Sequence, residues 1–301
     1  MTDNEFLLVD RISAINATDE KWDLQKNGYI SFSGGKDSTI LHYLFDEALP
    51  GNRIPRVFID TGIEYAMIRE FVLEMASHDD RFQIIKPTKP IKQILETYGY
   101  PFKSKEHSLR VDQFNKGHNS NYISKYIGGY SYGGKKSRFT CPSCLLYQFE
   151  EKGKYNFSNL CCAKLKKQPV KQWERANGRR IAITGMRAEE GGNRARLGCA
   201  IFKGGKLIHF HPLIKVSDDW EDWFVREREV HLCPLYSAPY NFKRTGCKGC
   251  PFALDLQQQL TTMLIYLPNE RKQCELIWKY VYDEYRRIGY RLDQFEQLKL
   301  F

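Results

Sequence analysis

The sequence lacks the features that would place the chain in a membrane or on a secretory route. No apolar run approaches the roughly 20 residues needed to cross a bilayer. Residues 1–5 are acidic and have neither the basic start nor the apolar core of a signal peptide. No internal repeat is present, which excludes a solenoid. We therefore expect a globular protein of the cytoplasm, with no membrane partner.

Composition excludes two further classes. The 301 residues are 42% hydrophobic and 14% aromatic, so wholesale disorder is excluded. Nine cysteines, an odd number without an export signal, argue against a disulfide framework and favour thiolate chemistry or metal ligation. The net charge of +10 suggests anionic partners such as nucleotides or nucleic acid.

Short β-prone runs alternate with apolar residues at helical spacing. The expected strands are residues 29–32, 56–60, 82–85, 181–184 and a hairpin over 200–208. The expected helices are residues 40–48, 67–75, 91–98, 164–176 and a segment that Ser217 caps. This alternation predicts an α/β fold with a doubly wound parallel sheet.

Two segments depart from the alternation. About residues 101–145 are polar and rich in Gly, Tyr, Asn, Ser and Lys, which predicts an inserted loop-rich arm. We expect a nucleotide-binding domain over residues 1–255 and a helical C-terminal extension over 256–301. The core of that extension is predicted to contain Leu264, Ile265, Leu276, Ile277, Tyr280 and Val281.

A glycine-rich turn follows the first expected strand. Residues 33–38 read Ser-Gly-Gly-Lys-Asp-Ser and stand where a strand ends and a helix begins. There, unpaired backbone N–H groups and the helix dipole favour an anion. The two glycines let the backbone approach a phosphate, and Lys36 adds a positive charge. The spacing is not that of the Walker A loop, and a chance Gly-Gly turn beside a lysine is the structural alternative.

The turn resembles the pyrophosphate loop S-G-G-x-D-S of the ATP pyrophosphatases, which implies a fold of the adenine nucleotide α-hydrolase type. In those enzymes the loop holds the β- and γ-phosphates of ATP while an acceptor attacks the α-phosphate, giving an adenylate and pyrophosphate. Residues 60–62, Asp-Thr-Gly, look like the second element of the same fold. The residues expected to bind the nucleotide are Ser31, Ser33, Gly34, Gly35, Lys36, Asp37, Ser38, Thr39, Asp60, Thr61, Gly62 and Gly185.

Four cysteines form two pairs far apart in the sequence, Cys161-Cys162 and Cys247-Lys248-Gly249-Cys250. Thiolates are soft ligands suited to zinc or an iron–sulfur cluster. Adjacent cysteines chelate one zinc poorly but can ligate different irons of one cluster. The arrangement resembles the [4Fe–4S] site of the assimilatory adenylylsulfate reductases, in the phosphoadenylylsulfate (PAPS) reductase family. The resemblance implies a [4Fe–4S] cluster on these four thiols.

More of that family's pattern is present over roughly residues 27–255. Its substrate-binding stretch T-G-L-R-R-x-Q-S-x-x-R is similar to residues 184–194, in which Arg187 and Arg194 match. Planar guanidinium groups suit phosphate or sulfate oxygens, although solvated arginines on a loop are the alternative. The catalytic residues that the resemblance implies are Lys36, Asp37, Arg187 and Arg194.

Two departures from the family point away from sulfate reduction. Sulfonucleotide reductases bind a substrate that is already adenylated, and their loop resembles S-G-A-E-D. This chain keeps Gly35, Lys36 and Ser38, which suit a pyrophosphate leaving group. The reductases also carry a nucleophilic cysteine in a C-terminal E-C-G-[LI]-H segment, whereas the last 27 residues here contain none. The neighbours of Cys274 are typical of a helix, which favours a packed thiol over a nucleophile.

The remaining cysteines and histidines leave several interpretations open. Residues 141–144, Cys-Pro-Ser-Cys, form another closely spaced pair, for which a zinc knuckle, redox or sulfur-carrying thiols, and packing all remain. Cys199 and Cys233 are expected to be structural. His209 and His211 alternate along a strand and are expected at the surface.

Basic residues gather in two places. Residues 164–180 contain seven Lys or Arg and one acid, and the arm contains Lys135, Lys136 and Arg138. Phosphate contacts come mainly from such side chains, so a nucleic-acid track is one interpretation and a solvated surface the other. Tyrosines of the arm are expected either to stack on bases or to pack. They are Tyr122, Tyr126, Tyr130 and Tyr132.

The leading hypothesis is an ATP-pyrophosphatase-type enzyme of the PAPS-reductase-like family that adenylates an acceptor and supports sulfur transfer. Nucleic-acid thiolation or phosphorothioation is the acceptor chemistry it suggests. The implied cofactors are ATP, Mg²⁺ and a [4Fe–4S] cluster. The implied partners are a nucleotide, a nucleic acid and a sulfur donor such as a cysteine desulfurase. The alternatives are a phosphoadenylylsulfate or adenylylsulfate reductase of sulfate assimilation, and a non-enzymatic iron–sulfur or zinc regulator that binds nucleic acid.

Overall fold

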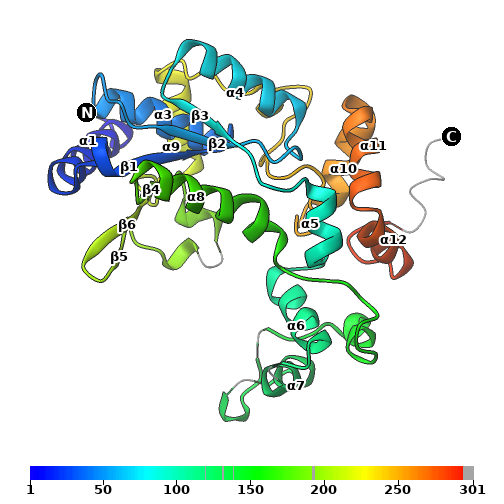
Figure 1. Ribbon diagram of the computed structural model, residues 1–301. Coiled ribbons are helices and arrows are strands. Elements are labelled where there is room, and N and C mark those ends of the chain that lie inside the picture. Colours follow the sequence, from blue (N-terminus) through cyan, green and yellow to red (C-terminus); the bar gives the residue numbers. More distant parts are fainter. Residues whose placement is uncertain (119, 131, 138, 192–193, 294–301) are drawn as a thin grey trace. The chain divides into compact units, whose positions relative to one another are not determined.

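The computed structural model describes residues 1–118, 120–130, 132–137, 139–191 and 194–293 (Figure 1). Arg138 of the predicted basic arm and residues 192–193 of the arginine-containing stretch lie outside this range. Unit 1 comprises residues 1–60, 64–87 and 169–246, and unit 2 comprises residues 61–63, 88–168 and 247–301. The predicted domain boundary after residue 255 remains a prediction.

Unit 1 is built around a six-stranded sheet in the order β3-β2-β1-β4-β6-β5. Only β5 and β6 are antiparallel, and every other neighbouring pair is parallel. The strands are β1 (Gly28–Phe32), β2 (Arg56–Ile59), β3 (Phe82–Ile85), β4 (Ile181–Ile183), β5 (Ala200–Lys203) and β6 (Lys206–Phe210). The predicted doubly wound sheet is confirmed. Its strand order reverses between β1 and β4, where open α/β sheets bind ligands.

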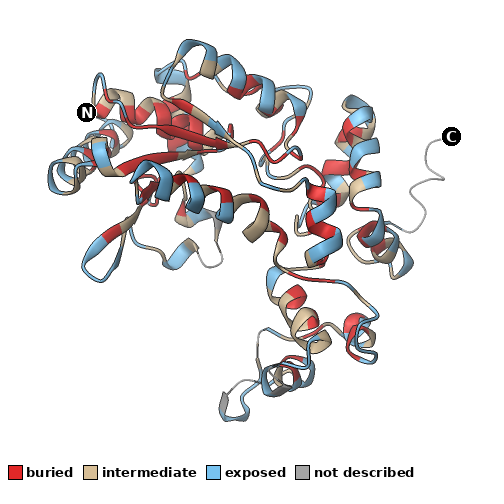
Figure 2. Ribbon diagram, in the orientation of Figure 1, coloured by how far each residue is buried: buried red, intermediate tan, exposed pale blue. Residues whose placement is uncertain are grey.

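Helices cover both faces of this sheet. They are α1 (Asp3–Trp22), α2 (Leu24–Asn27), α3 (Lys36–Ala48), α4 (Ala66–His78), α8 (Gln168–Asn177) and α9 (Asp218–Glu227). Ile30 of β1 packs in one cluster with side chains of α1, α3 and α9. Its neighbour Tyr29 packs with Trp173 of α8. Successive strand residues point to opposite faces, so the two clusters lie on opposite sides of the sheet. Figure 2 shows that the central strands, and parts of the helices beside them, are buried.

Unit 2 is mainly helical. Its helices are α5 (Ile91–Tyr98), α6 (Lys105–Asn115), α7 (Ser120–Gly128), α10 (Leu256–Tyr266), α11 (Pro268–Ile277) and α12 (Lys279–Arg287). A π-helical turn, Ala163–Lys167, leads into α8. The last three helices form the predicted C-terminal extension. Over the described residues of both units, no helix is at once long and apolar enough to cross a bilayer.

The arm contains two helices where the sequence predicted loops. Ser104 caps α6, because its hydroxyl accepts a hydrogen bond from the His107 backbone N–H at 3.2 Å. The buried positions of α6 are His107, Ser108 and Val111. Two of these three are polar, so the helical period does not appear as an apolar period in the sequence.

The predicted core of the C-terminal extension is wrong in part. Ile265 and Leu276 are 64% and 77% exposed, whereas Val281 is fully buried as predicted. The buried face is formed instead by Leu260, Met263, Cys274, Trp278, Tyr282 and Tyr285. Aromatic and sulfur-containing residues outnumber aliphatic ones among these six buried residues. The prediction that Cys274 is a packed thiol is confirmed, since it has no exposed surface.

Candidate functional site

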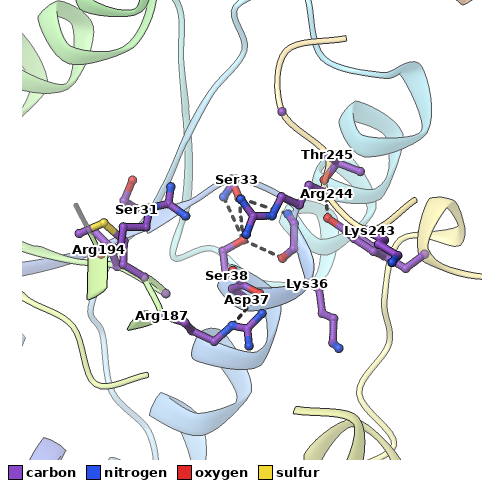
Figure 3. A pocket seen from close by; sticks show the side chains of 16 residues that line it. Ser31, Ser33, Lys36, Asp37, Ser38, Arg187, Arg194, Lys243, Arg244 and Thr245 are labelled. Atoms are coloured by element: carbon purple, nitrogen blue, oxygen red, sulfur yellow. Dashed lines mark hydrogen bonds and ion pairs between the residues drawn. The ribbon is translucent and has the colours of Figure 1, made fainter. Parts of the chain in front are cut away.

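A polar cavity of about 400 Å³ lies in unit 1 where β1 and β4 end, at the reversal point of the strand order (Figure 3). The structure therefore brings together residues that the sequence places about 150 positions apart. The predicted site residues that line the cavity are Ser31, Ser33, Gly35, Lys36, Asp37, Ser38, Gly185, Arg187 and Arg194.

The glycine-rich turn is closed by its own hydroxyls. Ser38 Oγ lies 3.0 Å from Ser33 Oγ, donates to the Gly35 carbonyl at 2.9 Å and accepts from the Ser33 N–H at 3.1 Å. Gly34 has φ +71°, and a Cβ there would lie 2.9 Å from the side chain of Ile68. Gly35 precedes α3 as its N-cap and supplies no side-chain cap. The first turn of α3 thus offers backbone N–H groups to an anion in the cavity.

Two further predicted residues support the turn. Thr39 lies behind it and donates its hydroxyl to the Gly35 carbonyl at 3.0 Å. Gly185, which follows β4, allows close approach to α3, because a Cβ at this position would lie 2.8 Å from the Asp37 carbonyl oxygen. An alanine at 185 would therefore push against backbone.

The second predicted element, residues 60–62, does not line the cavity. Asp60 follows β2 and is buried, with its carboxylate 3.1 Å from Arg69 Nε and 4.0 Å from Lys86 Nζ. Thr61 and Gly62 belong to unit 2. A nucleotide-binding role for these three residues remains a prediction.

Lys36 lines the cavity, but carboxylates hold its ammonium. Lys36 Nζ lies 2.6 Å from Asp222 Oδ1 and 3.4 Å from Glu221 Oε2, both on α9. Burial lowers the pKa of Lys36, but the bond to Asp222 and the two carboxylate charges outweigh it, so the pKa is raised. In Figure 3 the side chain extends away from Ser33 and Ser38. Lys36 is therefore charged and paired in this structure.

Arg187 is enclosed by four carboxylates. Its Nε lies 3.1 Å from Glu221 Oε1 and 3.6 Å from Asp37 Oδ1. Its Nη2 lies 2.7 Å from Asp218 Oδ1, and its Nη1 lies 3.3 Å from Glu189 Oε2. The residue is only 8% exposed. These contacts fix the guanidinium at the cavity wall, and they exclude the alternative of a solvated loop arginine.

Glu221 is the most buried acid of this cluster, with no exposed surface. Burial, and next the charge of Asp37, raise its pKa to about 8, although Arg187 and Lys36 act in the opposite direction. Sequence reasoning missed this residue. The available signal was the spacing of Asp218, Glu221 and Asp222, which places three acids on one face of α9.

We expect Glu221→Gln to stabilise the protein more at pH 9 than at pH 5. The native pKa of Glu221, about 8, is above its ordinary value of 4.5. Between these values the native state keeps the proton and the unfolded state loses it, so wild-type stability falls as the pH rises through this window. Glutamine does not titrate. The free energy of unfolding of the variant, relative to wild type, should rise by about 4 kcal/mol from pH 5 to pH 9.

Urea denaturation at pH 5, 7 and 9 measures this difference. Asp222→Asn is the matched control, because Asp222 is on the same helix and binds the same lysine but is 65% exposed. The change in the free energy of unfolding that Asp222→Asn causes should stay within about 1 kcal/mol at every pH. If the free energies of unfolding of Glu221→Gln and wild type change with pH in parallel, Glu221 is ionised throughout this range.

Seven residues that line the cavity were not among the predicted site residues, and three of them are consecutive cationic or hydroxyl residues. These three are Lys243, Arg244 and Thr245, which stand just before the Cys247 pair in the sequence. Thr245 Oγ1 is hydrogen-bonded to the hydroxyl of Tyr236, which also lines the cavity. The adjacent Lys-Arg pair was the available signal. With Lys36, Arg187 and Arg194, the cavity has five cationic side chains, which favours a polyanionic ligand.

The four predicted cluster cysteines are electrostatic neighbours within unit 2. Burial, and then the thiolates of Cys162, Cys247 and Cys250, raise the pKa of Cys161. Burial and the thiolates of Cys247 and Cys162 raise the pKa of Cys250 to about 12. Among the described residues, no three His, Cys, Asp or Glu side chains are arranged as metal ligands. The donor set still fits a thiophilic metal or cluster, because several neighbouring thiols ionise together only when a cation compensates them.

The Cys247–Cys250 loop is held by aromatic side chains of the C-terminal extension. Three loop carbonyls accept hydrogen bonds from these side chains. The pairs are Trp278 to Lys248 at 3.0 Å, Tyr282 to Gly249, and Tyr285 to Pro251 at 2.9 Å. The buried ammonium of Lys248 binds Glu270 and Gln273 of α11. The extension thus fixes the backbone that carries two of the four thiols.

The structure corrects the prediction for one of the histidines. His211 is fully buried rather than at the surface, and its Nδ1 lies 2.8 Å from Thr184 Oγ1. Burial lowers its pKa to about 4. Cys233 is fully buried, in agreement with a structural role. In the second pair Cys141 is buried and Cys144 is exposed.

Comparison with known proteins gives a family match over most of the chain. The profile of the phosphoadenosine phosphosulfate reductase domain matches residues 27–136 and 132–253. The uncharacterized protein MJ0973 of Methanocaldococcus jannaschii is 24% identical over 268 residues, which are 88% of this chain and 49% of that protein. The chain spans about half the length of this relative.

Solved structures with a similar backbone are remote in sequence. Phosphoadenylyl-sulfate reductase from Candida auris has a TM-score of 0.43 at 14% identity and covers 73% of this chain and 80% of its own. Candida glabrata FMN adenylyltransferase in complex with ATP has 0.47 at 16%, covering 81% and 61%. The U34-tRNA thiolase NcsA from Methanococcus maripaludis, with its [4Fe-4S] cluster, has 0.39 at 14%, covering 95% and 80%.

Proposed function

Because the chain belongs to the phosphoadenosine phosphosulfate reductase domain family, we propose that it is an ATP-dependent enzyme that adenylates an acceptor and supports sulfur transfer to it. The observation that carries this proposal is the cavity in unit 1. It combines the first turn of α3, whose N-cap is a glycine, with five cationic side chains at the reversal point of the sheet. This combination suits the terminal phosphates of ATP better than a single sulfate.

In the proposed reaction, MgATP binds with its β- and γ-phosphates at the first turn of α3. Backbone N–H groups and the Ser33 and Ser38 hydroxyls face these phosphates. An acceptor oxygen attacks the α-phosphorus, the bond from the α-phosphorus to the bridging oxygen breaks, and pyrophosphate leaves with the bonding electrons. Lys36 neutralises the charge that develops on the leaving group. A sulfur nucleophile then displaces AMP from the acceptor, so the acceptor oxygen departs with AMP.

Nucleotide binding requires an exchange of partners on α9. Asp222 and Asp218 hold Lys36 and Arg187 through side chains that are 65% and 69% exposed. A polyphosphate presents more negative charge than either carboxylate, so it competes for these cations at the exposed contacts. Glu221, which is buried between the same two cations, keeps them at the cavity wall during the exchange.

Cys161, Cys162, Cys247 and Cys250 are the residues that would hold the [4Fe–4S] cluster. When bound, the cluster would order this part of unit 2 or supply sulfur. Protein purified without oxygen should absorb at about 400 nm if a cluster is present. Cys247→Ser should remove this absorbance, whereas the buried Cys274, replaced by alanine, should leave it.

Isotope exchange between pyrophosphate and ATP, with and without candidate acceptors, tests the proposed function. Exchange is expected, because adenylation releases pyrophosphate reversibly. A sulfonucleotide reductase would instead release sulfite from adenylylsulfate without consuming ATP. A non-enzymatic binder would retain nucleic acid and show no exchange. Sulfite release without exchange, or neither reaction, would contradict the proposal.

A further inference from the structure

The arm of unit 2 combines positive charge with exposed aromatic rings. Residues 113–149 contain no Asp or Glu. The cations of this stretch are Lys116, Lys125, Lys135, Lys136 and Arg138. In a chain with 36 acids, so long a stretch without one favours a polyanion, although Lys116 is paired with Asp112 just before it at 2.8 Å.

Three rings near the end of this arm are accessible. Phe139 is 76% exposed, Tyr130 is 58% exposed and Tyr122 is 48% exposed. The guanidinium of Arg110 lies 5.3 Å from the centre of the Tyr122 ring. Tyr126, by contrast, is buried and its hydroxyl lies 2.9 Å from His107 Nδ1. Of the arm tyrosines whose side chains the structure describes, Tyr126 thus packs, and Tyr122 and Tyr130 face solvent.

The backbone brings rings and cations next to each other at the end of α7. Tyr130 and Lys136 form an antiparallel bridge, and the Ser137 N–H donates to the Gly129 carbonyl at 2.8 Å. The Tyr130 N–H donates to the Lys125 carbonyl at 3.0 Å. Residues directly opposite in an antiparallel pair project to the same side. The side chains of Lys136 and Tyr130 therefore leave the backbone on the same side.

From this juxtaposition we propose that the described part of the arm tip, residues 122–130, 133–137 and 139, binds a single-stranded segment of nucleic acid. The rings stack on unpaired bases and the lysines contact the phosphates. A duplex stacks its bases on one another, so exposed rings cannot reach their faces. The inference rests on the proposed function only in taking this strand to be the acceptor, and it assigns acceptor binding to unit 2.

An anionic lipid surface is the competing ligand for a basic and aromatic patch. Membrane-binding helices need a continuous apolar face. In α7 two apolar residues, Ile123 and Tyr126, are 6% and 5% exposed and are used inside unit 2, so that only Tyr122 and Ile127, at 48% and 37%, remain at its surface. The exposed rings that remain are separated by polar residues and lysines. This pattern favours bases and phosphates over acyl chains.

Fluorescence anisotropy with the full chain tests the proposal. The probes are labelled 20-nucleotide oligo-uridine and oligo-deoxythymidine, a 20-base-pair duplex, and phosphatidylserine vesicles, at 50 and 200 mM salt. Tyr130→Ala/Phe139→Ala should weaken single-strand binding about tenfold or more and leave the salt dependence unchanged. Lys135→Ala/Lys136→Ala should lower the slope of log affinity against log salt by about 1.4, which corresponds to two phosphates.

Two controls match these variants. Tyr266→Ala removes a ring that is 45% exposed on α10, and Lys203→Ala/Lys206→Ala removes two exposed lysines of the β5–β6 hairpin. Neither should change strand affinity more than about twofold. Preference for RNA or for DNA would identify the acceptor class. Unchanged affinity in both arm variants, or wild-type binding to duplex or vesicles as tight as to single strands, would overturn the inference.

The same proteins separate this inference from the proposed function. Binding of MgATP without an acceptor depends on unit 1, so the arm variants should retain it, whereas their exchange with a strand as the acceptor should fall with strand affinity. Loss of exchange in wild type with strand binding intact would contradict the proposed adenylation and leave the arm assignment standing. Exchange in a protein that binds no strand would contradict the arm assignment and leave the proposed adenylation standing.

Discussion

Lys36→Ala is expected to lower ATP–pyrophosphate exchange by about 10²- to 10³-fold. A fixed cation that meets charge developing on a leaving group acts mainly in the transition state, so its removal lowers the rate more than it weakens ATP binding. Lys36 stands in the first turn of α3 and lines the cavity. Steady-state exchange with radiolabelled pyrophosphate measures the effect on the rate at saturating ATP, and at limiting ATP it also includes the effect on ATP binding.

Two further variants separate charge from structure. Lys36→Arg keeps the cation and should retain more exchange than alanine does. Asp222→Asn removes the 2.6 Å carboxylate contact to Lys36 but leaves the ammonium in place, so exchange should be unchanged or faster. Thermal denaturation checks that Lys36→Ala remains folded, since buried Glu221 loses one of its two cations. Exchange within about threefold of wild type in the folded alanine variant would rule out the proposed role of Lys36.

The local part of the nucleotide cavity was predictable from the sequence. A β-prone run, two glycines and an amphipathic helix follow one another within residues 29–48, and each is specified by neighbours in the chain. The contacts that close the turn, Ser38 with Ser33 and Gly35, also lie within five residues. Arg187 and Arg194 could be assigned to the same cavity only through the family resemblance.

The electrostatic partners of the cavity were not predictable in the same way. Glu221 lies 185 positions after Lys36, and its role depends on α9 packing beside α3 in one core. Nothing in the local sequence around residue 221 distinguishes a buried acid from a solvated one. Its burial is evident only when its carboxylate is seen 3.4 Å from Lys36 Nζ and 3.1 Å from Arg187 Nε.

The prediction for the C-terminal helices failed for a related reason. Leu276 and Cys274 are two positions apart on α11, and the larger apolar residue is the exposed one. Apolar spacing alone favoured Leu276 for the core. The buried face is selected by contacts to the Cys247–Cys250 loop, which a helical period cannot reveal. Polar atoms of Trp278 and Tyr282 are buried because they serve that loop.

Gly249→Ala tests how tightly the extension holds the cysteine loop. Gly249 has φ +58°, and a Cβ there would lie 2.5 Å from the Tyr282 hydroxyl and 2.7 Å from Cys274 Sγ. Both neighbours are buried in packed helices, so the alanine must displace backbone. Backbone strain and overpacking together should lower the free energy of unfolding by about 2–4 kcal/mol. The absorbance at about 400 nm per chain should fall as well, because the loop carries two of the four thiols.

Gly178→Ala supplies the matched control. Gly178 has φ +65° and nothing within 4 Å of the added Cβ, so the substitution costs only the strain of a left-handed alanine, about 1 kcal/mol. Combining Gly249→Ala with Cys274→Ala removes the Sγ that the new methyl meets. The double variant should therefore be more stable than the sum of the single effects predicts. If Gly249→Ala and Gly178→Ala have the same stability, and cluster absorbance is unchanged, the loop yields freely and the extension does not position its thiols.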